Sequence, residues 1–132
     1  MGETLAVHFP GGKRVDVQIR EFSIPTDQSP KAGGEGSAPE PFDLFLASLA
    51  ACAGIYALNF CQARQLSTEG LKLWMDWKRD PKQPLKAQVC YRLQLPKDFP
   101  EKYRGSLCKA IEHCTVKKMI QNAPEFSIRI ED

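Results

Sequence analysis

The cysteines are the residues of this sequence best suited to chemistry. There are five, Cys52, Cys61, Cys90, Cys108 and Cys114, without a Cys-x-x-Cys motif. The start of the chain alternates as a strand does, so no signal peptide is expected, and the thiols of a cytoplasmic protein stay reduced. With only two histidines present, a structural zinc site is not expected. The cysteines are therefore packing residues, or they include one reactive pair whose thiolate is a nucleophile.

Helix geometry limits which cysteines can form a disulfide. Cys52 and Cys61 lie nine residues apart on one expected helix, which is a rise of about 13.5 Å. Cys108 and Cys114 lie six residues apart, about 9 Å along an unbroken helix. Both separations exceed the roughly 7 Å between Cα atoms that a disulfide allows, so a bonded pair must join different elements. We expect Cys61, Cys90 and Cys108 to be packing residues, with Cys90 half-buried in a strand.

Cys52 and Cys114 have the surroundings that most favour reactivity. Cys52 is flanked by alanines and Gly54, so a substrate or another backbone can approach it closely. Two lysines follow Cys114 within four residues. If the last helix breaks near His113, Cys114 begins a new helix, where the dipole and these cations favour a thiolate. These residues alone do not decide between a reactive pair and structural cysteines.

The helix that carries Cys52 is expected to span about residues 41–63, because Pro41 suits a first helical turn and only Gly54 interrupts the segment. Apolar residues occur on every face of it, so it must be covered on all sides. A second copy of the chain could supply the missing cover, which predicts a homodimer. The longest apolar run, Leu44–Leu58, has 15 residues, fewer than the ~18–20 that span a bilayer, and no membrane partner is expected.

Alternating apolar and polar residues predict the strands, with turns between them. Strands are expected at about residues 4–9, 14–19, 21–24, 71–77, 85–95 and 126–130. Residues 28–41 are expected to form a loop or lid without helix or strand, and helical spacing from Tyr103 to Cys114 either continues to Ala123 or gives way to a separate short helix. The pattern predicts an α+β fold in which antiparallel sheets accompany one long central helix.

Size and charge narrow the class of protein. A chain of 132 residues fits a single domain, 1–132. Its 18 Lys and Arg residues against 16 Asp and Glu residues give a net charge of +2, without the basic excess of nucleic-acid-binding domains. No nucleic-acid partner is expected.

Two segments of the sequence resemble the OsmC/Ohr superfamily of osmotically inducible and organic hydroperoxide resistance proteins. The first runs from Gly33 to Cys52 (GGEGSAPEPFDLFLASLAAC), and the second from Glu112 to Lys118 (EHCTVKK), so that 62 residues separate the two cysteines. The resemblance extends in element order over nearly the whole chain and is nearest the less characterised OsmC-like branch. It implies an OsmC-like fold and an intertwined homodimer with active sites at the subunit interface.

The resemblance also implies roles for the two cysteines. Cys52 matches the peroxidatic thiol of the family's hydroperoxide reductases, and Cys114 matches the resolving thiol. The thiolate attacks the distal peroxide oxygen, and the resulting sulfenic acid condenses with the second cysteine. A dithiol reductant such as a lipoyl group then restores the pair. No metal and no organic cofactor is implied.

The residues that would support Cys52 depart from the family's pattern. The position of the glutamate in the organic hydroperoxide branch is Phe42, and an acid follows one step later as Asp43. On a straight helix Asp43 points about half a turn away from Cys52, and it is also explained as a first-turn acid that the helix dipole favours. Arg14 and Arg20 are the candidates for the family's arginine, and both are also explained as solvated strand residues.

The leading hypothesis is thus a cytoplasmic, thiol-dependent redox protein that reduces organic hydroperoxides in response to oxidative stress. The alternative is a protein that binds a small hydrophobic or thiol-bearing ligand in the pocket of the dimer interface without turnover. A third possibility, a scaffold for a larger complex, rests only on Trp74 and Trp77.

Overall fold

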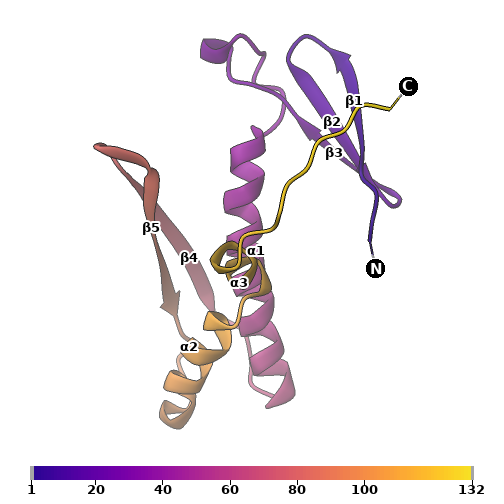
Figure 1. Cartoon of the computed structure of the whole chain (residues 1–132). Helices are drawn as coiled ribbons and strands as arrows, with labels where there is room; N and C mark the ends of the chain where they lie inside the picture. The colour runs from indigo at the N-terminus through magenta and orange to yellow at the C-terminus, as the bar shows by residue number, and fades with distance from the viewer. Residues whose placement is uncertain (1, 132) are drawn as a thin grey trace. The chain divides into compact units, whose positions relative to one another are not determined.

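The structure is a computed structural model and describes residues 2–131. Its helices and strands confirm an α+β fold with antiparallel sheets and one long helix (Figure 1). The chain divides into two compact units, Met1–Ala47 and Ser48–Asp132. The helix α1 (Pro41–Ala63) begins in the first unit and continues into the second.

The first unit contains a three-stranded antiparallel sheet in the order β1 (Ala6–Gly11), β2 (Arg14–Ile19), β3 (Phe22–Thr26). The first two strands are joined where predicted, at a turn in which Gly12 has φ 58°, a conformation that glycine adopts most readily. The following loop contains the 3₁₀ helix η1 (Pro30–Ala32). The sequence predicts no helix there, because a single turn capped by a serine hydroxyl is too short to show a period.

One carboxylate organises the glycine-rich loop between β3 and α1. Asp27 is only 1% exposed. It accepts hydrogen bonds from the Ser37 hydroxyl (2.6 Å), from the Ser37 and Glu35 backbone N–H groups (3.0 and 3.3 Å), and from the Gln28 N–H (2.7 Å). These bonds, that of the Ser37 hydroxyl first, lower the pKa of Asp27 to about 2. A Cβ at Gly34 would lie 2.1 Å from the Gln28 carbonyl oxygen, so only glycine fits there.

The long helix α1 has the predicted bounds and passes through Gly54 without interruption. Its length and apolar composition also meet the requirements of a membrane span, as those of a core helix can. Within the second unit, residues three and four apart along it, from Ala53 to Cys61, are buried against other elements. Other apolar residues of this helix stay at the surface, and Ile55 is 46% exposed.

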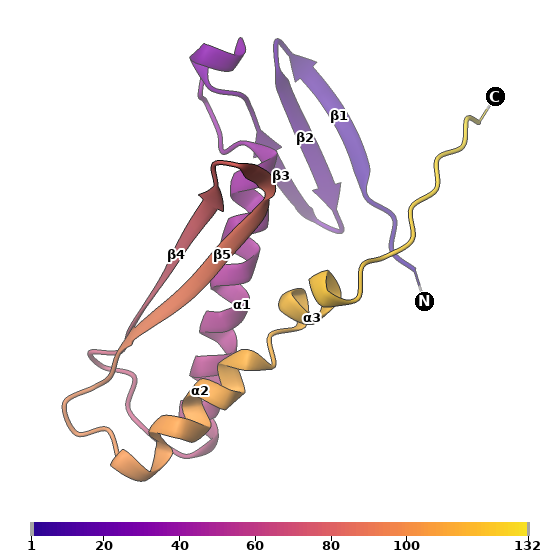
Figure 2. The same cartoon turned by 60° about the vertical axis from the view of Figure 1, so that its left-hand side comes forward.

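The second unit packs α1 against a hairpin and a second helix (Figure 2). The strands β4 (Lys72–Asp80) and β5 (Gln83–Gln94) form an antiparallel pair that extends closer to the turn than predicted. After the 3₁₀ helix η2 (Glu101–Tyr103), the helix α2 (Arg104–Glu112) completes the core. The buried residues of this core are Ala53, Ala57, Phe60, Cys61, Leu107 and Ile111.

The last part of the chain is a short helix and an extended segment. The helix α3 (Thr115–Gln121) is separate from α2, and Cys114 lies between them. The strand predicted near Phe126 is wrong for the described residues, because residues 123–131 pair with no other strand. Phe126, Ile128 and Ile130 are 89%, 98% and 91% exposed. An alternating pattern becomes a strand only where a neighbouring strand supplies hydrogen bonds.

Candidate active site

The break between α2 and α3 positions Cys114. The last turn of α2 closes with a hydrogen bond from the Cys114 N–H to the Ile111 carbonyl (3.2 Å), and the Cys114 carbonyl accepts the Lys118 N–H in the first turn of α3 (3.1 Å). Between these two bonds Cys114 leaves the helical conformation, with φ −47° and ψ 122°. Its side chain is 1% exposed. Cys114 is thus buried at the start of α3, as the sequence predicts for a break near His113.

The structure brings Cys52 and Cys114 together. The two side chains are joined by a hydrogen bond, although they lie 62 positions apart in the sequence. The half-buried Cys52, on α1, also accepts hydrogen bonds from the backbone N–H groups of Val116 and Thr115, in the first turn of α3. The sulfur atom of Cys52 therefore lies where one thiol and two amides can donate to it.

These contacts distinguish the two thiols electrostatically. Burial by itself raises the pKa of Cys52, but the hydrogen bonds from the Cys114 thiol and from the Val116 and Thr115 amides outweigh burial, and the pKa is lowered overall. Burial, the hydrogen bond with Cys52 and the negative charge of Cys52 raise the pKa of Cys114. Cys52 is thus the thiol that ionises more readily, and the Cys114 thiol is the one that donates to it.

This distribution bears on one expectation from the sequence, that a helix start and two lysines favour a thiolate at Cys114. The Lys117 and Val116 amides do lower the pKa of Cys114, but burial and Cys52 raise it more. In the structure the amides at the start of α3 also point to the sulfur of Cys52, which receives their hydrogen bonds together with that of the Cys114 thiol. The helix start therefore activates the cysteine of another helix.

A tyrosine on α1 fixes the two elements relative to each other. The Tyr56 hydroxyl is hydrogen-bonded to the Thr115 hydroxyl at 2.8 Å. Tyr56 follows Cys52 by four residues, and Thr115 follows Cys114 directly, so this bond lies one helical turn from the thiol pair. The spacing of four from Cys52 is the signal in the sequence from which this residue could have been found.

A second tyrosine, on the hairpin, is close to both sulfur atoms. Tyr91 lies opposite Met75 in the register of β4 and β5 and packs against the core of the second unit. Burial raises the pKa of its phenol, and negative charge on either cysteine raises it further. In the sequence Tyr91 belongs to the apolar face of an alternating strand, which gives no indication of this position.

The three residues predicted to support Cys52 lie in the first unit. Asp43 accepts a hydrogen bond from the Glu40 backbone N–H (2.9 Å), which caps the first turn of α1. Arg20 lies in the turn after β2 with φ 51° and forms an ion pair with Glu3, so it is not the strand residue that we predict. Arg14 is exposed at the start of β2. A role for any of them at Cys52 stays a prediction.

The remaining cysteines are separate from this pair. Cys61 is completely buried in the core, and burial raises its pKa, as expected of a packing residue. Cys90 and Cys108 are exposed, so their prediction as buried or half-buried residues is wrong. Cys108 follows Leu107, which points into the core, and therefore lies on the outer face of α2.

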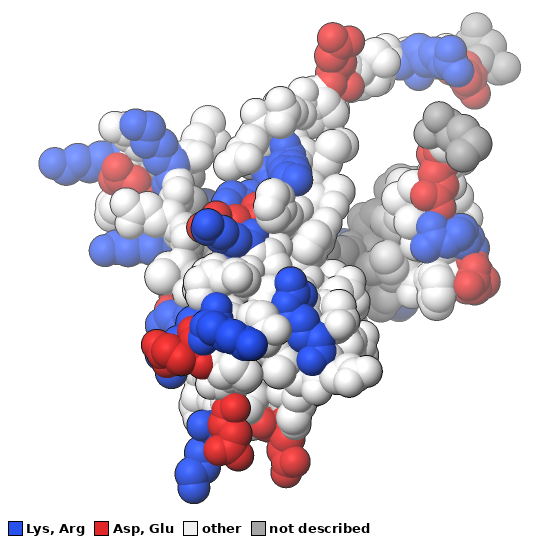
Figure 3. All heavy atoms as spheres, turned by 90° about the horizontal axis from the view of Figure 1, so that it is seen from below, with Lys and Arg blue, Asp and Glu red and all other residues white. Residues whose placement is uncertain are grey.

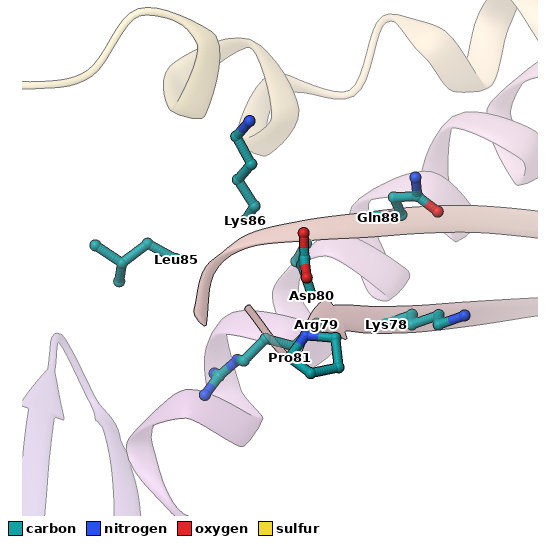
Figure 4. Close-up of a pocket in the computed structure, with 8 residues that line it drawn as sticks. Lys78, Arg79, Asp80, Pro81, Leu85, Lys86 and Gln88 are labelled. Carbon is teal, nitrogen blue, oxygen red and sulfur yellow. The ribbon is translucent and has the colours of Figure 1, made fainter. Parts of the chain in front are cut away.

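Residues 2–131 contain no cluster of three or more His, Cys, Asp or Glu side chains that could hold a metal ion. They do form a pocket of about 690 Å³ at the tip of the hairpin, with Lys78, Arg79 and Lys86 among its eight lining residues (Figure 4). Neither Cys52 nor Cys114 lines this pocket. We therefore place the candidate site at the two thiols and not at this pocket.

Comparison with known proteins gives one family and several related structures. A family model described as OsmC-like protein matches residues 34–129, which include both cysteines. No functionally curated protein matches the sequence.

The solved structures are similar in fold at low sequence identity. An osmotic stress induced and detoxification response protein from Psychrobacter arcticus has a TM-score of 0.72 and 20% identity, over 89% of this chain and 88% of that one. The organic hydroperoxide resistance protein OsmC from Legionella pneumophila has a TM-score of 0.63 and 21% identity, over 92% and 90%. An organic hydroperoxide resistance protein from Vibrio cholerae, with captopril bound in one active site, has a TM-score of 0.57 and 16% identity, over 90% and 85%. These likenesses show the fold.

Proposed function

Because the chain belongs to the OsmC-like protein family, we propose that it is a thiol-dependent reductase of organic hydroperoxides that acts in the response to oxidative stress. Cys52 is the peroxidatic cysteine, and Cys114 is the resolving cysteine. The observation that carries this proposal is the hydrogen bond between the two thiols, with the pKa of Cys52 lowered and that of Cys114 raised. A nucleophile and a neutral thiol next to it are the two groups that the reaction needs.

The reaction uses both sulfur atoms in turn. The Cys52 thiolate attacks the distal oxygen of the hydroperoxide, the O–O bond breaks, and Cys52 becomes a sulfenic acid while an alkoxide leaves and takes up a proton. The Cys114 thiol then attacks the sulfenic sulfur, so that a disulfide forms and water leaves. A dithiol of the lipoyl type reduces the disulfide and is itself oxidised to a disulfide. None of these steps needs a metal ion or an organic cofactor.

The proposed protein is a cytoplasmic homodimer. Apolar side chains at the surface of the second unit support a partner copy: Ile55, Met119 and Ile120 are 46%, 56% and 48% exposed. The apolar side chains near Phe126, in a segment that pairs with no described strand, are also exposed and would be buried by a partner copy. We propose no nucleic-acid or membrane partner; the net charge is only +2, and the face shown in Figure 3 carries both signs of charge. Light scattering of the eluting peak in size-exclusion chromatography measures the number of copies.

Stopped-flow oxidation with cumene hydroperoxide and with hydrogen peroxide tests the activity. We expect Cys52→Ser to abolish fast oxidation. Cys114→Ser keeps the first step and accumulates a sulfenic acid that dimedone traps, but forms no intramolecular disulfide. Cys108→Ser, at an exposed cysteine of α2, is the matched control and should behave as the wild type. Wild-type oxidation no faster than that of a free thiol would refute the proposal.

The alternative function, binding of a small hydrophobic or thiol-bearing ligand, is favoured by one observation. Captopril, a small thiol compound, occupies an active site of the related protein from Vibrio cholerae. If this chain is a binding protein, intact-mass measurement and ligand-shifted melting should find a ligand that the Cys52→Ser variant retains. Ready formation of the Cys52–Cys114 disulfide with hydroperoxide would instead support the enzyme.

A further inference from the structure

The proposed reaction leaves one proton unassigned. When the Cys52 thiolate attacks an alkyl hydroperoxide, the leaving group is an alkoxide, which is a strong base. A donor placed at that oxygen stabilises the developing charge and can supply the proton. The following inference rests on the proposed function and concerns which side chain of the second unit is this donor.

Four side chains described at this site carry a hydroxyl or thiol group besides Cys52, and three of them are already engaged. The Cys114 thiol donates to Cys52 itself, and the Tyr56 and Thr115 hydroxyls are hydrogen-bonded to each other. The fourth group is the hydroxyl of Tyr91. It makes no hydrogen bond to any residue from 2 to 131, and so it is free to donate to a substrate.

Tyr91 packs on the same core as the elements that carry the thiol pair. Tyr91 is half-buried on the face of β5 that packs on the core, which contains Ala53, the neighbour of Cys52 on α1. The same core contains Ile111, whose carbonyl accepts the Cys114 N–H. The elements that carry the two cysteines thus both lie against the surface to which Tyr91 belongs. Both cysteines also act electrostatically on the phenol, so Tyr91 lies near the thiol pair.

The charge of the thiol pair keeps the phenol in its donor form. Burial and the nearby Cys114 and Cys52 raise the pKa of Tyr91 above its ordinary value. At neutral pH the hydroxyl therefore retains its proton, whereas the pKa of Cys52 is lowered. An alkoxide is more basic than a phenolate, so transfer of the proton to the leaving oxygen is favourable.

We propose that Tyr91 is a catalytic residue that protonates the leaving oxygen of the hydroperoxide. The Cys52 thiolate, R–O–OH and the Tyr91 phenol give Cys52 sulfenic acid, R–OH and the Tyr91 phenolate. The new bond is S–O, the bond that breaks is O–O, sulfur loses two electrons, and the phenolate recovers its proton from water. This role makes alkyl hydroperoxides, whose leaving groups are strongly basic, the substrates that gain most from the site.

Oxidants with different leaving groups test this role in Tyr91→Phe. With cumene hydroperoxide we expect the oxidation of Cys52 to slow by about 10²-fold, the lower end of general-acid catalysis. With peracetic acid, whose acetate leaving group needs no proton, the rate should stay close to that of the wild type. Alkylation of Cys52 by iodoacetamide should also be unchanged, because it reports only on the thiolate. Tyr103→Phe, at a half-buried tyrosine packed on Phe60, is the control and should change none of these rates.

The other outcomes overturn the inference in distinguishable ways. An equal loss in all three reactions would mean that Tyr91 only holds Cys52 in place. Unchanged oxidation by cumene hydroperoxide would remove Tyr91 from the reaction and leave the proposed function intact, whereas a wild-type protein inert to every peroxide would remove both. If Tyr91→Phe does not fold, the oxidation rates of the wild type in H₂O and in D₂O test the inference instead. If a proton is transferred as the O–O bond breaks, D₂O should slow the reaction with cumene hydroperoxide more than the reaction with peracetic acid. Equal solvent isotope effects in the two reactions would refute the inference.

Discussion

The hydrogen bond between Tyr56 and Thr115 is expected to control the reactivity of Cys52 more than the stability of the fold. Tyr56→Phe removes the 2.8 Å contact and keeps the ring. Thr115 is exposed, so its hydroxyl can bond to water instead, and the loss in unfolding free energy should be about 1 kcal/mol or less. For a domain of this size that lowers Tm by about 4 °C.

The effect on the thiol should be larger, because α3 is then less firmly held against α1. The Thr115 and Val116 amides that lower the pKa of Cys52 would lose their fixed position, and the pKa should rise. Loss of one hydrogen bond destabilises the thiolate by about 1.5 kcal/mol relative to the neutral thiol. That corresponds to about a tenfold slower reaction of Cys52 at any pH below its pKa.

Two measurements separate these effects. Urea unfolding gives the change in stability, and thiolate absorbance at 240 nm against pH, with the rate of alkylation by iodoacetamide, gives the change at Cys52. Tyr103→Phe should leave the titration of Cys52 unchanged and is the control. If Tyr56→Phe lowers stability but leaves the titration and alkylation of Cys52 as in the wild type, the bond does not position α3, and the reasoning is wrong.

The remaining predictions concern the loop and the core. Gly34→Ala places a Cβ 2.1 Å from the Gln28 carbonyl oxygen and should reduce the free energy of unfolding by at least about 2 kcal/mol in urea titrations. The pKa of Asp27 is lowered from 3.8 to about 2, so its contribution to stability is complete above pH ~4 and is lost as the pH falls towards 2; melting curves of Asp27→Asn should lack this acid-dependent part. Leu107→Ala, at a side chain 1% exposed, should cost about 3 kcal/mol, whereas Cys108→Ala next to it should melt like the wild type.

The sequence predicts best the elements that are specified by their own residues. The bounds of β2 follow from three apolar residues in alternation, and those of α1 from Pro41 at its start. The strand predicted near Phe126 shows the limit of such patterns. Alternation shows which side chains of a segment would form an apolar face. It does not show whether a neighbouring strand is present to form hydrogen bonds with that segment.

The candidate site was predictable in its cysteines and not in its surroundings. Cys52 and Cys114 could be singled out from small neighbours and a helix start. The direction of the amides of α3 could not, because it depends on how two helices far apart in the chain pack together. The position of Tyr91 could not be predicted for a similar reason. Its neighbours depend on the register of the hairpin and on how the hairpin packs on α1.

The position of Cys114 between two helices also determines which part of the molecule must give way during a redox cycle. Cys52 is held within a helix of 23 residues, whereas Cys114 forms a joint flanked by the last turn of α2 and the seven residues of α3. Formation and reduction of a Cys52–Cys114 disulfide would therefore leave α1 unchanged and move α3. The exposed segment beyond residue 122 would move with it, so its susceptibility to a protease is expected to report the oxidation state of the pair.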